Sequence, residues 1–273
     1  EKFANPHSSH KLGREAAAVV EAARDAVERL LPAGGRRYFT SGATEALNWA
    51  IKCAGSGGIA LPDTEHAAVR DTAHFMKTMK RKVAVLPVGV DGLLPGKTTI
   101  PKGTGLVATM LVNNEIGVIQ PVAEIARLAH EAGALMLCDA VQGFGRIPIP
   151  HGPDLIAISA HKIRIGALWV RDGVEIGALL HGGGQEGGLR SGTLSPALCA
   201  GFGVAANLAR LSMDEDRAHA TRLWSLAMEM LPSGWVVNGS QTQRYPGNLN
   251  LRRDGLDANR LISEVRSVAF SAG

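Results

Sequence analysis

Ionisable and hydroxyl residues follow several apolar segments of the chain, at the points where strands would end. The segment "LMLCDA" carries Asp139 at its end, and "DLIAISAHK" closes with Ser159, His161 and Lys162. A carboxylate inside an apolar wall needs a partner to stay charged. A lysine held at a strand end would be partly desolvated, which lowers its pKa and makes its amine a nucleophile. The ligands of doubly wound sheets lie beyond such strand ends, so these residues predict a reactive site there.

A third feature is "TSGATE", which indicates a turn leading into a helix that starts near Thr44. The free backbone N–H groups at the start of a helix bind anions, and the Thr44 hydroxyl adds a donor. The G-x-x-x-x-G-K pattern of nucleotide-binding loops is absent. Taken alone, the turn fits a simple helix cap as well as a phosphate site.

Asp139, Lys162 and the turn before Thr44 together match the three needs of pyridoxal phosphate. These are a counter-charge for the ring nitrogen, a lysine that forms a Schiff base, and a cradle for the phosphate. A metal at Asp139 is the alternative, but the sequence has no matching His or Cys cluster. Lys162 considered alone would be a surface lysine, and only the combination favours the cofactor.

Composition excludes several other classes of protein. The 273 residues are 45% apolar and 20% charged, without an apolar run long enough to span a membrane or an N-terminal signal peptide. The net charge of +4 is dispersed, so we expect no nucleic-acid partner. Cys53, Cys138 and Cys199 lie in apolar surroundings and indicate buried thiols in a reducing compartment, the cytoplasm.

Apolar strands alternate with helices along most of the chain, which predicts an α/β fold with a buried, mostly parallel sheet in three layers. We assign residues 1–212 to this large domain. The expected helices cover Arg14–Leu31, a stretch from Thr44, residues 64–80 and Pro121–Ala132, and the expected strands are "RRYFT", "RKVAVLPV", "TGLVATMLVNN", "ALMLCDAV", "DLIAISA" and "GALWVR".

Residues 213–273 indicate a smaller α+β domain that is incomplete, with too little chain for a core of its own. Two helices, Ser195–Leu211 and Asp214–Leu231, lead into it. The strands "GWVVNG" and "PGNLNLR", a helix near Asp257–Arg266 and a final strand "SVAFSAG" follow.

Seven segments occur in an order that resembles a known family. They are "FANPHSSHKLGREA", "TSGATEALNWAIK", "EHAAVRDT", "VNNEIGVIQP", "DAVQGFGRIPI", "SAHKI" and "GGGQEGGLRSGTLS". Together they resemble the class V aminotransferases, specifically the cysteine desulfurases among these fold-type I pyridoxal phosphate enzymes. The resemblance runs over nearly the whole chain.

The resemblance implies a role for each matching residue. Lys162 would form the Schiff base and move protons, and Asp139 would pair with the ring nitrogen. Gln142 would bind the phenolic oxygen, and His66 would stack on the ring or relay protons, although it could instead cap a helix. Asn114 would contact substrate or cofactor, or simply form a turn. The residues implied at the phosphate are Ala43, Thr44, Ser159, His161 and, from the neighbouring subunit of a homodimer, Thr193.

The implied reaction converts L-cysteine to L-alanine and leaves a persulfide on the enzyme. The persulfide sulfur would pass to an acceptor or scaffold protein for iron–sulfur cluster or thio-cofactor synthesis. The alternatives are a selenocysteine lyase, a cysteine sulfinate desulfinase, a cystine lyase or a non-catalytic homologue.

Three departures from the family pattern lead us to expect a longer chain from which segments are omitted. The family's opening segment and the Gly-Pro-Lys-Gly turn after its lysine are absent. The persulfide-forming cysteine and an arginine for the substrate carboxylate would follow Gly273. The segment "IRIG" is too short to turn between two strands, which predicts a break between Arg164 and Ile165.

Overall fold

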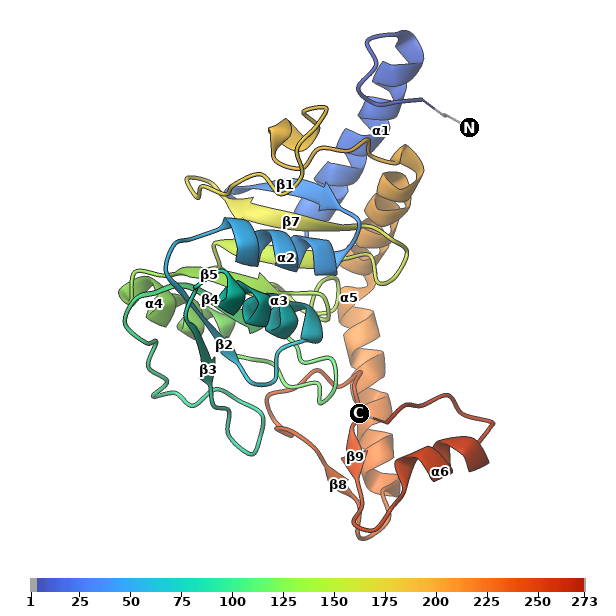
Figure 1. The fold of residues 1–273 in the computed structure, drawn as a ribbon. Helices are drawn as coiled ribbons and strands as arrows, with labels where there is room; N and C mark the ends of the chain where they lie inside the picture. Colours follow the sequence, from blue (N-terminus) through green and yellow to red (C-terminus); the bar gives the residue numbers. More distant parts are fainter. Residues whose placement is uncertain (1–3, 273) are drawn as a thin grey trace.

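The computed structural model describes residues 4–272 and is built around a seven-stranded sheet (Figure 1). The strands are β1 (Gly35–Thr40), β2 (Gly58–Pro62), β3 (Val83–Leu86), β4 (Thr104–Met110), β5 (Leu135–Asp139), β6 (Leu155–Ser159) and β7 (Gly166–Arg171). Their order is β1-β7-β6-β5-β4-β2-β3, and only β7 runs antiparallel to its neighbours. The mostly parallel sheet predicted from the sequence is confirmed.

Helices cover both faces of this sheet. They are α1 (Lys11–Glu28), α2 (Ala43–Cys53), α3 (Ala67–Thr78), α4 (Val122–Glu131) and α5 (Pro196–Met230). Neighbouring strand residues divide between two apolar clusters: Leu137 packs with α2 and α3, whereas Cys138 packs with α1, α4 and α5. This alternation follows from the two-residue period of a strand and produces the predicted three layers (Figure 1).

The region after residue 195 differs from the prediction in two ways. A single helix of 35 residues, α5, replaces the two expected helices, because no Gly or Pro interrupts the stretch around Ser212. The domain limit predicted at residue 212 therefore lies inside α5, which runs from the sheet down to the C-terminal segment (Figure 1).

The C-terminal segment contains β8 (Val236–Val237), β9 (Leu251–Arg252) and α6 (Ala258–Glu264). Both strands lie within segments predicted to be strands, and the structure pairs them in antiparallel fashion. The strand predicted at "SVAFSAG" is wrong for residues 267–272, which have no strand partner within the described chain, and Gly273 lies outside the described residues.

The connection between β6 and β7 closes within a few residues as a hairpin. Ser159 lies opposite Gly166, and the Ala160 N–H donates to the Ile165 carbonyl at 3.0 Å. His161, Lys162 and Arg164 turn the chain with positive φ angles of 49°, 75° and 63°. Contrary to the prediction, the short "IRIG" segment leaves room for a turn, because left-handed residues make the tight hairpin possible at some cost in strain.

Candidate active site

A cavity of about 420 Å³ opens at the carboxyl ends of the parallel strands. It is lined by nine of the ten residues predicted for the site: Ala43, Thr44, His66, Asn114, Asp139, Gln142, Ser159, His161 and Lys162. The tenth, Thr193, is exposed and does not line this cavity. The fold therefore brings together at the strand ends residues that lie up to 119 positions apart in the sequence, from Ala43 to Lys162.

The start of α2 forms one wall of the cavity and suits a phosphate group. The N-cap residue, Gly42, has no side chain, and no other side chain of the described residues caps the free backbone N–H groups at the start of α2. Strand β7 comes so close that a Cβ on Gly166 would lie 2.9 Å from the Gly42 Cα. The absence of side chains at both glycines leaves the positive end of the α2 dipole open to the cavity.

Asp139 supplies a buried carboxylate at the end of β5. Only 6% of the residue is exposed, and its Oδ1 accepts a hydrogen bond from the Val141 N–H at 3.0 Å. Burial raises the pKa of Asp139, and the Val141 N–H and the nearby His66 oppose that rise. A protonated ring nitrogen in the cavity would supply the charge partner that this carboxylate needs.

His66 caps helix α3 and also faces the cavity. Its Nδ1 accepts a hydrogen bond from the Ala68 N–H at 3.0 Å, so the capping role that the sequence left open is present. An accepting Nδ1 places the proton of the neutral ring on Nε2. The cap therefore fixes both the orientation and the tautomer of the imidazole, and the exposed ring remains available to a ligand.

Two amide side chains occupy further positions around the cavity. The Gln142 Oε1 accepts a hydrogen bond from Arg146, which leaves the Gln142 amide N–H₂ free to donate to a ligand oxygen. Asn114 is half-buried, and its Nδ2 donates to Glu115 at 3.0 Å. The main-chain carbonyl of Asn114 accepts a hydrogen bond from the Asn248 Nδ2 at 3.0 Å, so the C-terminal segment packs against the turn that carries Asn114.

Lys162 and His161 lie on the hairpin after β6, and both are exposed. The expected partial burial of Lys162 is not found, because the hairpin projects the lysine beyond the edge of the sheet instead of enclosing it. Ser159 stabilises the start of this turn, as its Oγ accepts from the His161 N–H at 3.2 Å.

Partial burial and the positive charges of Arg146 and Lys162 lower the pKa of His161. Low pKa favours the neutral imidazole, which can accept or donate a hydrogen bond at a phosphate.

Glu65 is a buried carboxyl beside the site, outside the cavity lining, that the sequence analysis missed. It is 3% exposed, and its Oε1 accepts from the Met110 N–H at 2.8 Å, while Oε2 has no hydrogen-bond partner among residues 4–272. Met110 lies opposite Asp139 in the β4–β5 register, so the two carboxyl groups approach the same point of the sheet. Burial raises the pKa of Glu65 well above its usual range; the Met110 N–H opposes this and the Asp139 charge adds to it. Only its position beside His66 could have drawn attention to Glu65.

We expect the free energy of unfolding to fall less with rising pH in Glu65→Gln than in the wild type. A carboxyl whose folded pKa lies above its unfolded pKa stabilises the fold at low pH, and this stability is lost as pH rises through the folded pKa. Each pKa unit of difference corresponds to about 1.4 kcal/mol. Urea unfolding of Glu65→Gln from pH 4 to pH 9 should show a smaller decline than the wild type. Glu215 is exposed, so Glu215→Gln is the control. If the free energy of unfolding fell with pH equally in Glu65→Gln and the wild type, the raised pKa of Glu65 would be contradicted.

Two other features, a metal-binding cluster and a membrane-spanning helix, are absent from residues 4–272. These residues contain no group of three or more His, Cys, Asp or Glu side chains that could hold a metal ion. None of their helices is long and apolar enough to cross a membrane.

The sequence and the fold of this chain resemble those of known proteins. The model of the family "Aminotransferase class-V" matches residues 1–273, so the chain belongs to the class V aminotransferase family. Among curated relatives, proteins named cysteine desulfurase IscS from Rickettsia bellii and Rickettsia rickettsii are each 40% identical. The matches cover all of this chain and 72% of each relative, over 295 residues against the 273 here, so the relatives have additional residues within the matched region.

Solved structures give the same assignment. A "NifS-like protein" is 31% identical with a TM-score of 0.88, covering 97% of this chain and 79% of that one. DndA from Streptomyces lividans is 32% identical with a TM-score of 0.84, over 97% of this chain and 81% of its own. The family, the fold class and the resemblance to cysteine desulfurases predicted from the sequence are confirmed.

Proposed function

We propose that this protein is a pyridoxal phosphate-dependent cysteine desulfurase. The observation that carries the proposal is the convergence of Lys162, Asp139, His66 and the open start of α2 on one cavity. Relatives that are 40% identical over the full chain and are named cysteine desulfurases support it. Pyridoxal phosphate would draw electron density away from the substrate Cα and so make its proton acidic.

The residues of the cavity would hold the cofactor from several sides. The α2 N-terminus with Ala43 and Thr44, together with Ser159 and His161, would bind the phosphate. Asp139 would accept a hydrogen bond from the ring nitrogen and keep it protonated. Gln142 would donate to the phenolic oxygen through the amide group that Arg146 leaves free.

Lys162 and His66 would carry out the proton transfers. The Lys162 amine would hold the cofactor covalently and, once released, would act as the general base that takes the proton from the substrate Cα and as the general acid that gives it back. The His66 ring, fixed by its cap at Ala68, would lie against the cofactor with its Nε2–H directed to a ligand atom. Asn114 would contact the substrate.

The net reaction transfers the substrate's sulfur atom to a thiol: L-cysteine and R–SH give L-alanine and R–S–SH. None of Cys53, Cys138 and Cys199 lines the cavity. Burial raises the pKa of all three thiols, for Cys199 to about 11. Because a thiolate is the nucleophile, these three residues are unsuited to accept the sulfur, and the accepting thiol is a different one.

We further infer a homodimer in which the exposed Thr193 reaches the phosphate bound by the second copy. We also propose that the protein passes the sulfur to an acceptor or scaffold protein and that it works in the cytoplasm. The chain would divide into a large domain and a smaller C-terminal domain. A second copy would also enclose the exposed Lys162 and supply the desolvation that the single chain does not.

Product analysis tests the proposed reaction. Purified protein loaded with pyridoxal phosphate should release equal amounts of alanine and sulfide from L-cysteine with dithiothreitol in excess. Release of sulfite from cysteine sulfinate, without sulfide from cysteine, would instead favour a desulfinase. Selenide from selenocysteine without sulfide from cysteine would favour a selenocysteine lyase, and no product from any of these substrates would contradict the proposal.

A further inference from the structure

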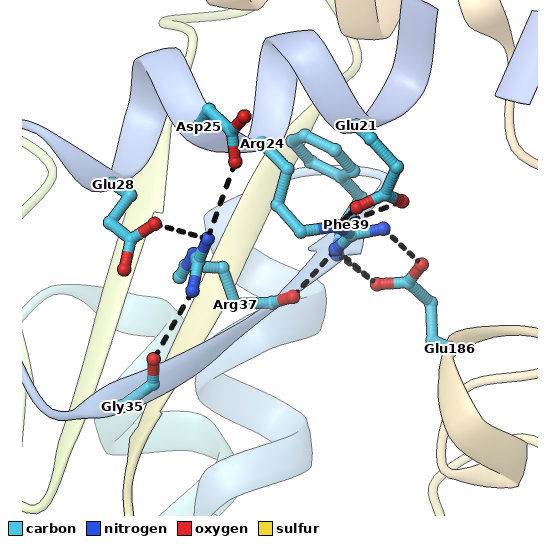
Figure 2. Close-up of polar contacts among 8 residues, drawn as sticks. All are labelled: Glu21, Arg24, Asp25, Glu28, Gly35, Arg37, Phe39 and Glu186. Carbon is cyan, nitrogen blue, oxygen red and sulfur yellow. Dashed lines mark hydrogen bonds and ion pairs between the residues drawn. The ribbon is translucent and has the colours of Figure 1, made fainter. Parts of the chain in front are cut away.

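The loop that carries Thr193 is held to the rest of the molecule at two charged points. The first is Glu186, whose side chain is 4% exposed. Its two oxygens accept from the Arg24 guanidinium at 2.8 and 3.0 Å, and one of them also accepts from the Phe39 N–H at 2.7 Å. Figure 2 shows this contact, in which the loop is anchored to α1 and β1 by one carboxylate.

The second point is Arg190, which reaches the phosphate-binding side of the molecule. Its Nε and Nη2 donate to the two oxygens of Glu45 at 2.6 and 3.0 Å. Both side chains are about 15% exposed, so solvent screens the pair only partly. Such a two-bonded pair between arginine and carboxylate fixes orientation as well as distance.

Glu45 has a further contact, inside the turn that would cradle the phosphate. Its Oε2 accepts from the Ser41 N–H at 2.8 Å, in addition to the bond from Arg190. A hydrogen-bonded chain therefore runs from the turn at Ser41, through Glu45, to Arg190. Thr193 follows Arg190 by only three residues, and internal bonds such as Gly192 N–H to Gln185 Oε1 at 2.9 Å stiffen the segment between them.

We propose that Glu45 and Arg190 are a positioning pair that makes the α2 turn and the Thr193 segment move as one unit. Phosphate bound at α2 in one copy would thereby restrain the segment that the same copy offers to the phosphate of its partner. The two phosphate sites of a dimer would be coupled through this pair. The coupling between copies rests on the proposed function, whereas the link between turn and segment rests on the contacts of the single chain.

Hydrogen exchange of wild type, Glu45→Gln, Arg190→Gln and the double variant tests the link. In cofactor-free protein, each single variant should speed exchange in residues 41–47 and in residues 188–194 together. The double variant should add little to either, because one interaction is lost in all three. Pyridoxal phosphate should bind about tenfold more weakly to each variant. Loosening of only the segment that carries the substitution, or additive effects, would overturn the proposal.

Arg24→Gln is the matched control, because it breaks the other anchor of the same loop. It should speed exchange around Glu186 but leave residues 41–47 unchanged, which separates the link from general destabilisation. Arg190→Lys keeps the charge but loses the two-bonded geometry, so it provides an intermediate case if Arg190→Gln fails to fold. Accelerated exchange at 41–47 in Arg24→Gln equal to that in Glu45→Gln would count against a specific link.

Thr193→Ala isolates the coupling between copies. Without the Thr193 hydroxyl, pyridoxal phosphate should still slow exchange in residues 188–194, and adding Glu45→Gln should remove that effect. No slowing in Thr193→Ala would show that protection comes only from direct contact and would overturn the coupling.

If wild-type protein binds no pyridoxal phosphate at all, the proposed function fails, and exchange in the cofactor-free variants still decides the link.

Discussion

Replacing Lys162 with alanine is expected to remove the visible absorption band of lysine-bound pyridoxal phosphate and to lower alanine formation by about 10³-fold or more. Lys162 lies on the hairpin after β6 and lines the same cavity as Asp139. No other lysine lines this cavity within residues 4–272, so the lost amine has no substitute. The measurements are the absorption spectrum after reconstitution and alanine release from L-cysteine.

A matched lysine separates this role from a general effect of charge. Lys52 lies in the last turn of helix α2 and packs against the Phe75 ring, outside the cavity. Lys52→Ala should keep the absorption band and turnover of the wild type. Small amines such as methylamine should partly restore turnover to Lys162→Ala, because they can replace the missing base in the space that it leaves. An unchanged spectrum in Lys162→Ala would contradict the assignment of the cofactor lysine.

The sheet and the cavity could be predicted because both depend on local pattern. Short apolar segments such as "LMLCD" form strands with buried faces wherever they lie in the chain. Parallel strands bring their carboxyl ends to one edge, so the residues that follow them meet without further information. Asp139 and Ser159, which end β5 and β6, line one cavity as this rule predicts.

The features that the sequence did not reveal depend on contacts between distant residues. Glu45 and Arg190 are 145 positions apart, and no local pattern marks them as partners. The buried state of Glu65 likewise follows from its bond to Met110, 45 positions away. The exposure of Lys162 comes from left-handed residues in the hairpin, a conformation that bulky residues adopt only when tertiary contacts impose it.

Replacing Asp139 with asparagine is expected to weaken retention of pyridoxal phosphate and to lower turnover by about 10²-fold or more. The carboxylate is buried at the end of β5, where a ring nitrogen can share its charge. Asparagine preserves the shape and the bond from the Val141 N–H but cannot hold the ring nitrogen in its protonated form. The measurements are cofactor loss on dialysis, followed by absorbance, and the rate of alanine formation.

Asp154→Asn provides the matched control for Asp139→Asn. Asp154 is buried too, with 0% of the residue exposed, and it directly precedes β6 at the opposite edge of the same sheet. There it pairs with His130 at 2.8 Å and accepts a hydrogen bond from the Met136 N–H at 2.7 Å. Its loss should reduce stability against urea, as breaking a buried pair does, but leave cofactor retention and turnover per folded molecule unchanged. The role of Asp139 depends on this contrast: equal loss of cofactor in both variants would mean that Asp139 supports the sheet rather than the ring nitrogen. Wild-type retention and turnover in Asp139→Asn would show that the cavity binds the cofactor without a charged partner at this position.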